Sequence, residues 1–101
     1  MKRYIKASTD YNRMFRTIVD YFKSIVNEAG CSYCSYNDYV VRPDWDNGGI
    51  RFELQWDGGN ISENDVMDKI ETYFGSGIRC NRSWGKWDHQ ITVFVEQYRC
   101  R

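Results

Sequence analysis

The fold is decided by the stretch Ile50-Arg51-Phe52-Glu53-Leu54-Gln55-Trp56-Asp57, in which apolar and polar residues alternate more cleanly than anywhere else in the chain. Successive side chains of a β-strand point to opposite faces of its sheet, so this pattern predicts one face on a hydrophobic core and one polar face. Gly58, Gly59 and Asn60 follow, and residues of these types commonly end a strand. We therefore expect a half-buried strand over residues 50–57.

An amphipathic helix is expected before this strand. Ser8, Thr9 and Asp10 are good N-cap residues, and Gly30 is a natural residue to follow a helix end. Between them, apolar residues recur at the spacing of one helix face. These residues are Tyr11, Met14, Phe15, Ile18, Val19, Phe22, Ile25 and Val26.

A second amphipathic helix is expected after the strand. Ser62, followed three residues later by Asp65, resembles a capping box with Asp in place of Glu. Gly75 is expected to end the helix. The apolar positions expected to be buried are Val66, Met67, Ile70, Tyr73 and Phe74.

The remaining β-prone segments complete the predicted order (β)αββαββ. They are a short first strand at residues 4–7, a strand at 33–41, and a final hairpin of 78–84 and 90–98. This order predicts an α+β class, with an antiparallel sheet of four to five strands and two helices on one face. With the first strand it matches a ferredoxin-like fold carrying an extra C-terminal strand, and without that strand it matches a permutation of the fold.

The two halves of the chain also resemble each other. The stretch Ile18-Val19-Asp20-Tyr21-Phe22-Lys23-Ser24 recurs as Ile70-Glu71-Thr72-Tyr73-Phe74-Gly75-Ser76, with Ile, Tyr, Phe and Ser in register. Trp45-Asp46, which precedes the alternating strand, is echoed by Trp87-Asp88. We therefore expect a single domain, 1–101, containing an internal αββ duplication with pseudo-repeats at 9–57 and 62–98, in which Phe22 and Phe74 both point into the core.

Composition limits the function. The 101 residues are enough for one modest core, and no apolar run is long enough to span a bilayer. The net charge is zero, which argues against a dedicated nucleic-acid binder, but residues 31–71 have a net charge of −6. Seventeen aromatic residues exceed the needs of a small core, and surface Tyr and Trp are typical of interfaces.

The candidate chemistry is sparse. Cys31 and Cys34 have CxxC spacing, and Cys80 and Cys100 complete a possible four-cysteine zinc site, which is kept as an alternative to free thiols or a disulfide. The single histidine, His89, leaves no multi-histidine metal site. We expect no enzymatic activity and no cofactor, because no catalytic set of residues stands out in the sequence.

Two binding surfaces compete. The leading hypothesis is a protein-binding module with an acidic and aromatic surface for a basic partner, made of Asp44, Trp45, Asp46, Asp57, Asp68 and Glu71. The alternative is a small nucleic-acid-binding domain that uses Arg13, Arg16, Lys23, Arg79 and Arg82, with Phe94 and Tyr98 available for stacking. No membrane partner is expected.

The opening Met1-Lys2-Arg3-Tyr4-Ile5-Lys6-Ala7-Ser8 resembles the start of short uncharacterised proteins from gram-positive bacteria, their phages and mobile elements. The resemblance implies a small accessory protein in the cytoplasm of the host bacterium. Small α+β phage proteins often inhibit host defence machinery, and anti-CRISPR proteins are among them. The specific expectation is therefore an inhibitor of a host defence nuclease, and no functional residue is carried over from the resemblance.

Overall fold

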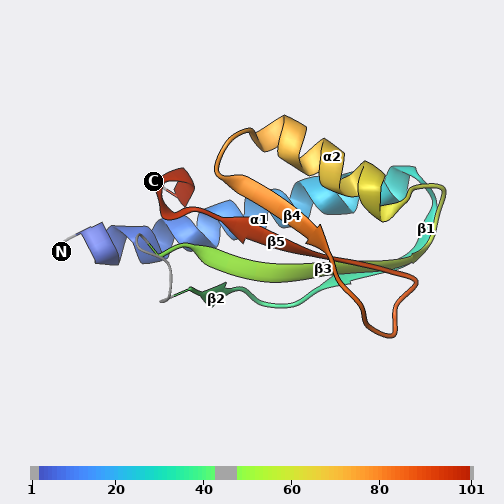
Figure 1. Cartoon of the computed structure of the whole chain (residues 1–101), viewed down its shortest axis with the longest axis horizontal. Helices are drawn as coiled ribbons and strands as arrows, with labels where there is room; N and C mark the ends of the chain where they lie inside the picture. The colour runs from blue at the N-terminus through green and yellow to red at the C-terminus, as the bar shows by residue number, and fades with distance from the viewer. Residues whose placement is uncertain (1–2, 43–47, 101) are drawn as a thin grey trace.

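The computed structural model describes the backbone of residues 3–42 and 48–100, and the side chains from Tyr11 onward within these ranges. The elements in order are α1 (Arg3–Glu28), β1 (Cys31–Tyr36), β2 (Val40–Val41), β3 (Ile50–Gly58), α2 (Glu63–Phe74), β4 (Ile78–Arg82), β5 (His89–Val95) and the 3₁₀ helix η1 (Gln97–Cys100). The strands form one antiparallel sheet in the order β1-β3-β5-β4, and β2 pairs with the start of β3. The expected α+β class with an antiparallel sheet is confirmed (Figure 1).

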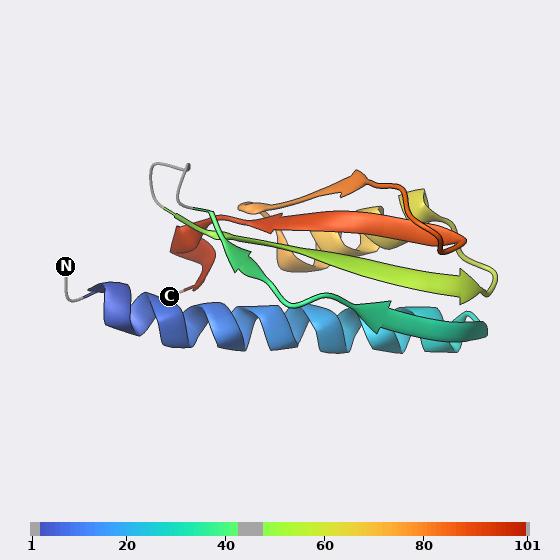
Figure 2. The same ribbon diagram turned by 90° about the horizontal axis from the view of Figure 1, so that it is seen from below.

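Both helices pack on the same face of the sheet. In Figure 2, α2 lies behind β4 and β5, and α1 runs alongside β1, so neither of these two helices stands in front of the strands. The opposite side of the sheet is therefore called the uncovered face. It carries the side chains at alternate positions of each strand, beginning in β3 with Arg51, which pairs with Phe94 of β5.

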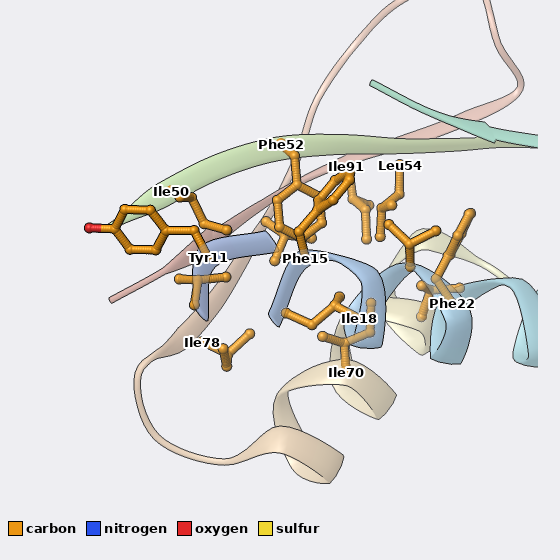
Figure 3. Packing of buried hydrophobic residues seen from close by; sticks show 14 of the residues in the cluster. Tyr11, Phe15, Ile18, Phe22, Ile50, Phe52, Leu54, Ile70, Ile78 and Ile91 are labelled. Atoms are coloured by element: carbon orange, nitrogen blue, oxygen red, sulfur yellow. The ribbon is translucent and has the colours of Figure 1, made fainter. Parts of the chain in front are cut away.

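The core lies between the helices and the sheet. As the alternation predicts, Ile50, Phe52, Leu54 and Trp56 of β3 are all buried. Phe15 of α1 packs edge-on against Phe52, with ring centroids 4.9 Å apart, and Phe22 packs in the same way against Trp56 at 5.6 Å. Figure 3 shows Ile18 and Phe22 of α1 and Ile70 of α2 directed into one cluster with Leu54 and Ile91.

The expected first strand at residues 4–7 is wrong, because α1 already begins at Arg3. The segment before Tyr11 contains neither Pro nor Gly. Once a helix has nucleated, each added residue contributes one hydrogen bond, so α1 extends upstream past the N-cap residue types at Ser8 to Asp10. The ferredoxin-like order is thereby lost, and the relation to a permuted form of that fold stays a prediction.

The expected strand at 33–41 is divided into two. Tyr36 pairs with Leu54 and Val40 with Arg51, so four steps along this edge strand span three steps of β3. The extra residue is a bulge, which bends the edge strand and interrupts its pairing. Asn37 still donates its N–H to the carbonyl of Glu53 at 3.0 Å, at the point where β1 ends.

The ends of the second half follow local rules with two corrections. The capping box is confirmed, since Ser62 Oγ accepts from the N–H of Asp65 and the Asp65 carboxylate accepts from the N–H of Ser62. The strand expected at 78–84 ends at Arg82. The strand expected at 90–98 ends at Val95, and η1 follows it. Arg99 of η1 donates to the Phe74 carbonyl at 2.6 Å, which satisfies an acceptor at the C-terminus of α2.

The arrangement of elements is symmetric about the β3–β5 pair, as a duplication would require. In each half a helix is followed by an edge strand and then by a central strand, and the two central strands are adjacent and antiparallel. The two Tyr-Phe pairs meet, since Tyr21 stacks on Tyr73 with centroids 4.3 Å apart. Phe22 is fully buried but Phe74 is only half-buried, and Tyr73 is 66% exposed, contrary to its expected burial. The duplication itself stays a prediction.

Candidate functional site

The middle of the uncovered face is polar and closely packed. Gln55 of β3 and Gln90 of β5 face each other across the strands and are only 5% and 9% exposed. A Cβ added at Gly85 would collide with the Gln90 side chain, so the β4–β5 loop lies directly against this face. The loop therefore encloses one end of a sheet face that no helix covers.

A small cavity opens where the edge strand is interrupted. Asn37 Nδ2 donates to Glu53 Oε1 at 2.9 Å, and Gln55 Nε2 reaches Asn37 Oδ1 at 3.4 Å. Beside this network lies a cavity of about 180 Å³, lined by Asn37, Asp38, Val40, Arg51, Phe52 and Glu53. Typical small-molecule sites have volumes of about 300–1,000 Å³, so this cavity has room for one small planar group.

Arginine side chains gather around Phe94 at the same end of the face. The guanidinium carbons of Arg42 and Arg79 lie over the ring, 5.4 and 5.8 Å from its centroid. Arg51, the cross-strand partner of Phe94, also lines the cavity. Guanidinium groups are attracted to the face of an aromatic ring, so these contacts hold positive charge at the surface of the sheet.

The opposite end of the face carries a stacked pair of aromatic residues. Trp87 of the β4–β5 loop stacks on Tyr33 of β1, with centroids 5.2 Å apart and ring planes at 10°. Asp57 Oδ1 accepts from the N–H of Asp88 at 2.7 Å, which ties this loop to the end of β3. The loop presents Trp84, whose side chain is 86% exposed.

The predicted acidic surface does not form one patch among the described residues. Asp57 lies on the uncovered face and holds the β4–β5 loop. Asp68 and Glu71 lie on α2, on the other side of the sheet, and Glu71 Oε2 accepts from the N–H of Cys80 at 2.8 Å. Three more predicted contacts, Asp44, Trp45 and Asp46, lie outside the described residues.

The predicted basic surface is also divided. Arg13 and Arg16 are exposed on α1, and Lys23 Nζ lies over the Tyr36 ring at 5.1 Å from its centroid. Arg79 lies beside Phe94 on the uncovered face. Arg82 is on the helix side of β4, because its cross-strand partner Ile91 belongs to the core. The predicted basic residues therefore do not form one surface, because only Arg79 lies on the uncovered face and the others lie on α1 or on the helix side of the sheet.

The four-cysteine zinc site is wrong, because Cys31 and Cys34 lie on β1 and Cys80 lies on β4, at opposite edges of the sheet. Three strand spacings of about 4.8 Å separate these edges. Among the described residues, no three His, Cys, Asp or Glu side chains are placed to hold a metal. None of the four cysteines forms a disulfide, and Cys100 is buried.

Burial makes two of these thiols poor nucleophiles. Burial, with a smaller contribution from the Glu71 carboxylate, raises the pKa of Cys80 to about 12. Burial and the neighbouring Cys31 thiol raise the pKa of Cys34 above its ordinary value. The β-bulge between Cys31 and Tyr33 brings Cys31 and Cys34 to the same side of β1, where both pack against the core.

His89 has structural contacts at the start of β5. Its ring stacks on Trp56, with centroids 5.0 Å apart, and Nδ1 lies 3.3 Å from Glu63 Oε2 at the first residue of α2. Burial raises the pKa of Glu63, but a hydrogen bond to its own backbone and the neighbouring His89 and Arg82 side chains outweigh this effect and hold the pKa below its ordinary value. These contacts join the N-terminus of α2 to the sheet.

Sequence reasoning missed the cluster around Phe94. The alternation placed Arg51 on the polar face, and Phe94 was identified as available for stacking, but nothing local in the sequence joins them to Arg42. Cross-strand pairing brings the three together. The sequence signal available was an aromatic residue at an outward position of one strand and arginines at outward positions of others.

No helix in the described ranges is long and apolar enough to cross a membrane. The comparisons with known proteins found no match, since no protein-family model, no curated protein and no solved structure is significantly similar to this chain.

Proposed function

We propose that this protein is a small, non-enzymatic binding module that engages a basic protein partner through the exposed face of α2. The observation that carries the proposal is the exposed side of this helix, which carries Asp65 and Asp68. It is flanked by a largely exposed Tyr73 on the side of α1 and by Glu71 on the side of β4. Lys69 is the one exposed basic residue of α2, so the helix face keeps a negative charge. Complementary charge of this kind increases association rates and selects partners.

Tyr73 supplies the aromatic part of this surface. Its ring is 66% exposed, and it stacks almost parallel on Tyr21, at 11°. The stacking contact limits the number of orientations that the ring can adopt before a partner binds. A prearranged aromatic side chain contributes contact area and loses little conformational entropy on binding, which is typical of interface anchors.

In its specific form, the proposal is that this protein is encoded by a phage and inhibits a defence nuclease of the host. A nuclease binds phosphates with a basic surface, and carboxylates on a helix can occupy the same surface in competition with nucleic acid. The support is the chemistry of α2 together with the resemblance of the first eight residues to phage and mobile-element proteins.

The test is affinity capture from lysate of a gram-positive host, with wild-type protein and the double variant Asp68→Lys/Tyr73→Ala as baits. Asp20→Lys, an exposed acidic position on α1, is the matched charge control. We expect a partner that binds the wild type and the control, binds the double variant at least about tenfold more weakly, and weakens with salt. A partner that loses affinity for the control as much as for the double variant would show that α2 is not the interface.

A further inference from the structure

We propose that the uncovered face of the sheet binds single-stranded nucleic acid, at the cluster formed by Phe94, Arg42, Arg51 and Arg79. This face lies on the opposite side of the sheet from α2, so the inference does not rest on the proposed protein-binding function. It differs from the basic surface expected from the sequence, of which only Arg79 belongs to this cluster.

The cluster around Phe94 offers a platform on which a nucleobase can stack. Phe94 is half-buried, and guanidinium groups lie over its ring at 5.4 and 5.8 Å. Both an aromatic ring and a planar guanidinium can stack on a nucleobase, and such stacking is tolerant of base sequence. The bases of a duplex are already stacked and paired, so a flat sheet face of this kind selects unpaired strands.

The cluster also places positive charge on both sides of the Phe94 ring. Arg51 and Arg79 belong to β3 and β4, the two strands that flank β5, so they stand on either side of Phe94. Guanidinium groups on both sides of a base platform are placed to contact the phosphates that flank the stacked base. Two or three such contacts predict a clear but moderate dependence of affinity on salt.

The cavity beside Arg51 gives the proposed site a preference among the nucleobases. Its volume of about 180 Å³ suits one planar group, and Glu53 lines it with a carboxylate that already accepts from Asn37. An ionised carboxylate accepts hydrogen bonds and donates none. Bases with an exocyclic amino group can donate to it, whereas uracil and thymine present carbonyl oxygens at the corresponding position. We therefore infer a preference for C or A over U or T.

The stacked pair of Tyr33 and Trp87 lies farther along the same face. Tyr33 is paired with Asp57 and Phe94 with Arg51, so about six residues of β3, or roughly 20 Å, separate the two aromatic sites. A ten-nucleotide strand is long enough to reach from the cluster around Phe94 toward this pair. The probes are therefore ten-nucleotide oligomers.

The experiment measures fluorescence anisotropy of labelled oligo(C), oligo(A) and oligo(U) RNA, their DNA equivalents, and a duplex control, at 50 and 200 mM salt. We expect binding of the single strands with C or A preferred, and a loss of affinity of about 7- to 20-fold between the two salt concentrations. Arg79→Ala is expected to reduce both affinity and salt dependence. Phe94→Leu is expected to weaken binding about 5- to 100-fold at either salt concentration.

Arg82→Ala is the matched control, because Arg82 lies on the same strand as Arg79 but on the helix side. Thermal unfolding of each variant separates lost binding from lost folding, and Arg51→Ala serves as a second test if Phe94→Leu unfolds. Failure of wild-type protein to bind any single strand at 50 mM salt would overturn the inference. So would equal loss from Arg82→Ala and Arg79→Ala, or tighter binding of the duplex.

Discussion

Truncation of Phe22 to Ala is expected to be among the most damaging single changes in this protein. The side chain is fully buried, and it packs edge-on against Trp56 with centroids 5.6 Å apart. Large-to-small changes of buried Phe cost about 3 to 5 kcal/mol, because the lost transfer free energy is joined by the cost of the cavity. The lost aromatic pair, worth about 0.5 to 1.5 kcal/mol, places Phe22→Ala in the upper half of that range.

Phe74→Ala is expected to cost much less, although the sequence repeat pairs Phe74 with Phe22. Phe74 is half-buried at the end of α2, so water can enter the space left by the ring and no enclosed cavity forms. Only part of the transfer free energy is lost, which amounts to about 1 to 2 kcal/mol. Tyr73→Ala removes one ring stack from an exposed side chain, at a cost of about 0.5 to 1 kcal/mol.

Urea unfolding followed by circular dichroism at 222 nm measures all three variants. A domain of this size has a stability of about 5 to 15 kcal/mol, and each kcal/mol lowers the melting temperature by about 4 to 8 °C. If Phe22→Ala is unfolded in water, Phe22→Leu provides the measurable comparison with Phe74→Leu. Equal losses at positions 22 and 74 would refute the reasoning from burial and would favour a strict duplication with equivalent core sites.

Three further predictions follow from the contacts of the helices and edge strands. Because the pKa of Glu63 is lowered in the folded state, its ionised carboxylate stabilises the fold fully above the unfolded-state pKa of about 4.3, and this stabilisation is lost as the pH falls through the lower, folded-state pKa. Glu63→Gln should therefore flatten the acid side of the stability curve. Parallel curves for variant and wild type would contradict this. With its pKa near 12, Cys80 should react with a thiol reagent at pH 8 far more slowly than Cys31, as mass spectrometry of partly labelled protein would report; equal labelling would show that the edge of β4 opens readily. Glu71→Ala should lower the free energy of unfolding by about 1 to 3 kcal/mol, because it removes the acceptor of the Cys80 N–H. The N–H left without a partner on an edge strand should also increase self-association, which light scattering measures. A monomeric variant of unchanged stability would show that the hydrogen bond has no such role.

Much of the fold could be predicted because its signals are local. The alternation over residues 50–57 predicts a half-buried strand. Its apolar residues, Ile50, Phe52, Leu54 and Trp56, do face the core. Ser62 and Asp65 lie one helical turn apart, so their capping box needs only the helix that they begin. Local signals mislead where they conflict. The N-cap residue types before Tyr11 do not mark the start of α1, because a helix that continues upstream gains a hydrogen bond for each added residue.

The candidate site could not be predicted in the same way. The ring of Phe94 meets Arg42 and Arg79 only because β3, β5 and β4 are neighbours in a particular register. A shift of one residue would move Arg51 from the uncovered face to the core, so its role depends on every contact that fixes the register.

The sequence by itself therefore determined which residues favour helix, strand and turn, and which face of each element is apolar. Only the tertiary structure decided which polar faces became neighbours. It placed the acidic residues of α2 and the arginines around Phe94 on opposite sides of the sheet, and it put Cys31 and Cys80 at opposite edges. The physical reason is the range over which the interactions act. Propensities and caps act within a few residues, whereas strand order and register are set by burying one common core, to which every described helix and strand except β2 contributes.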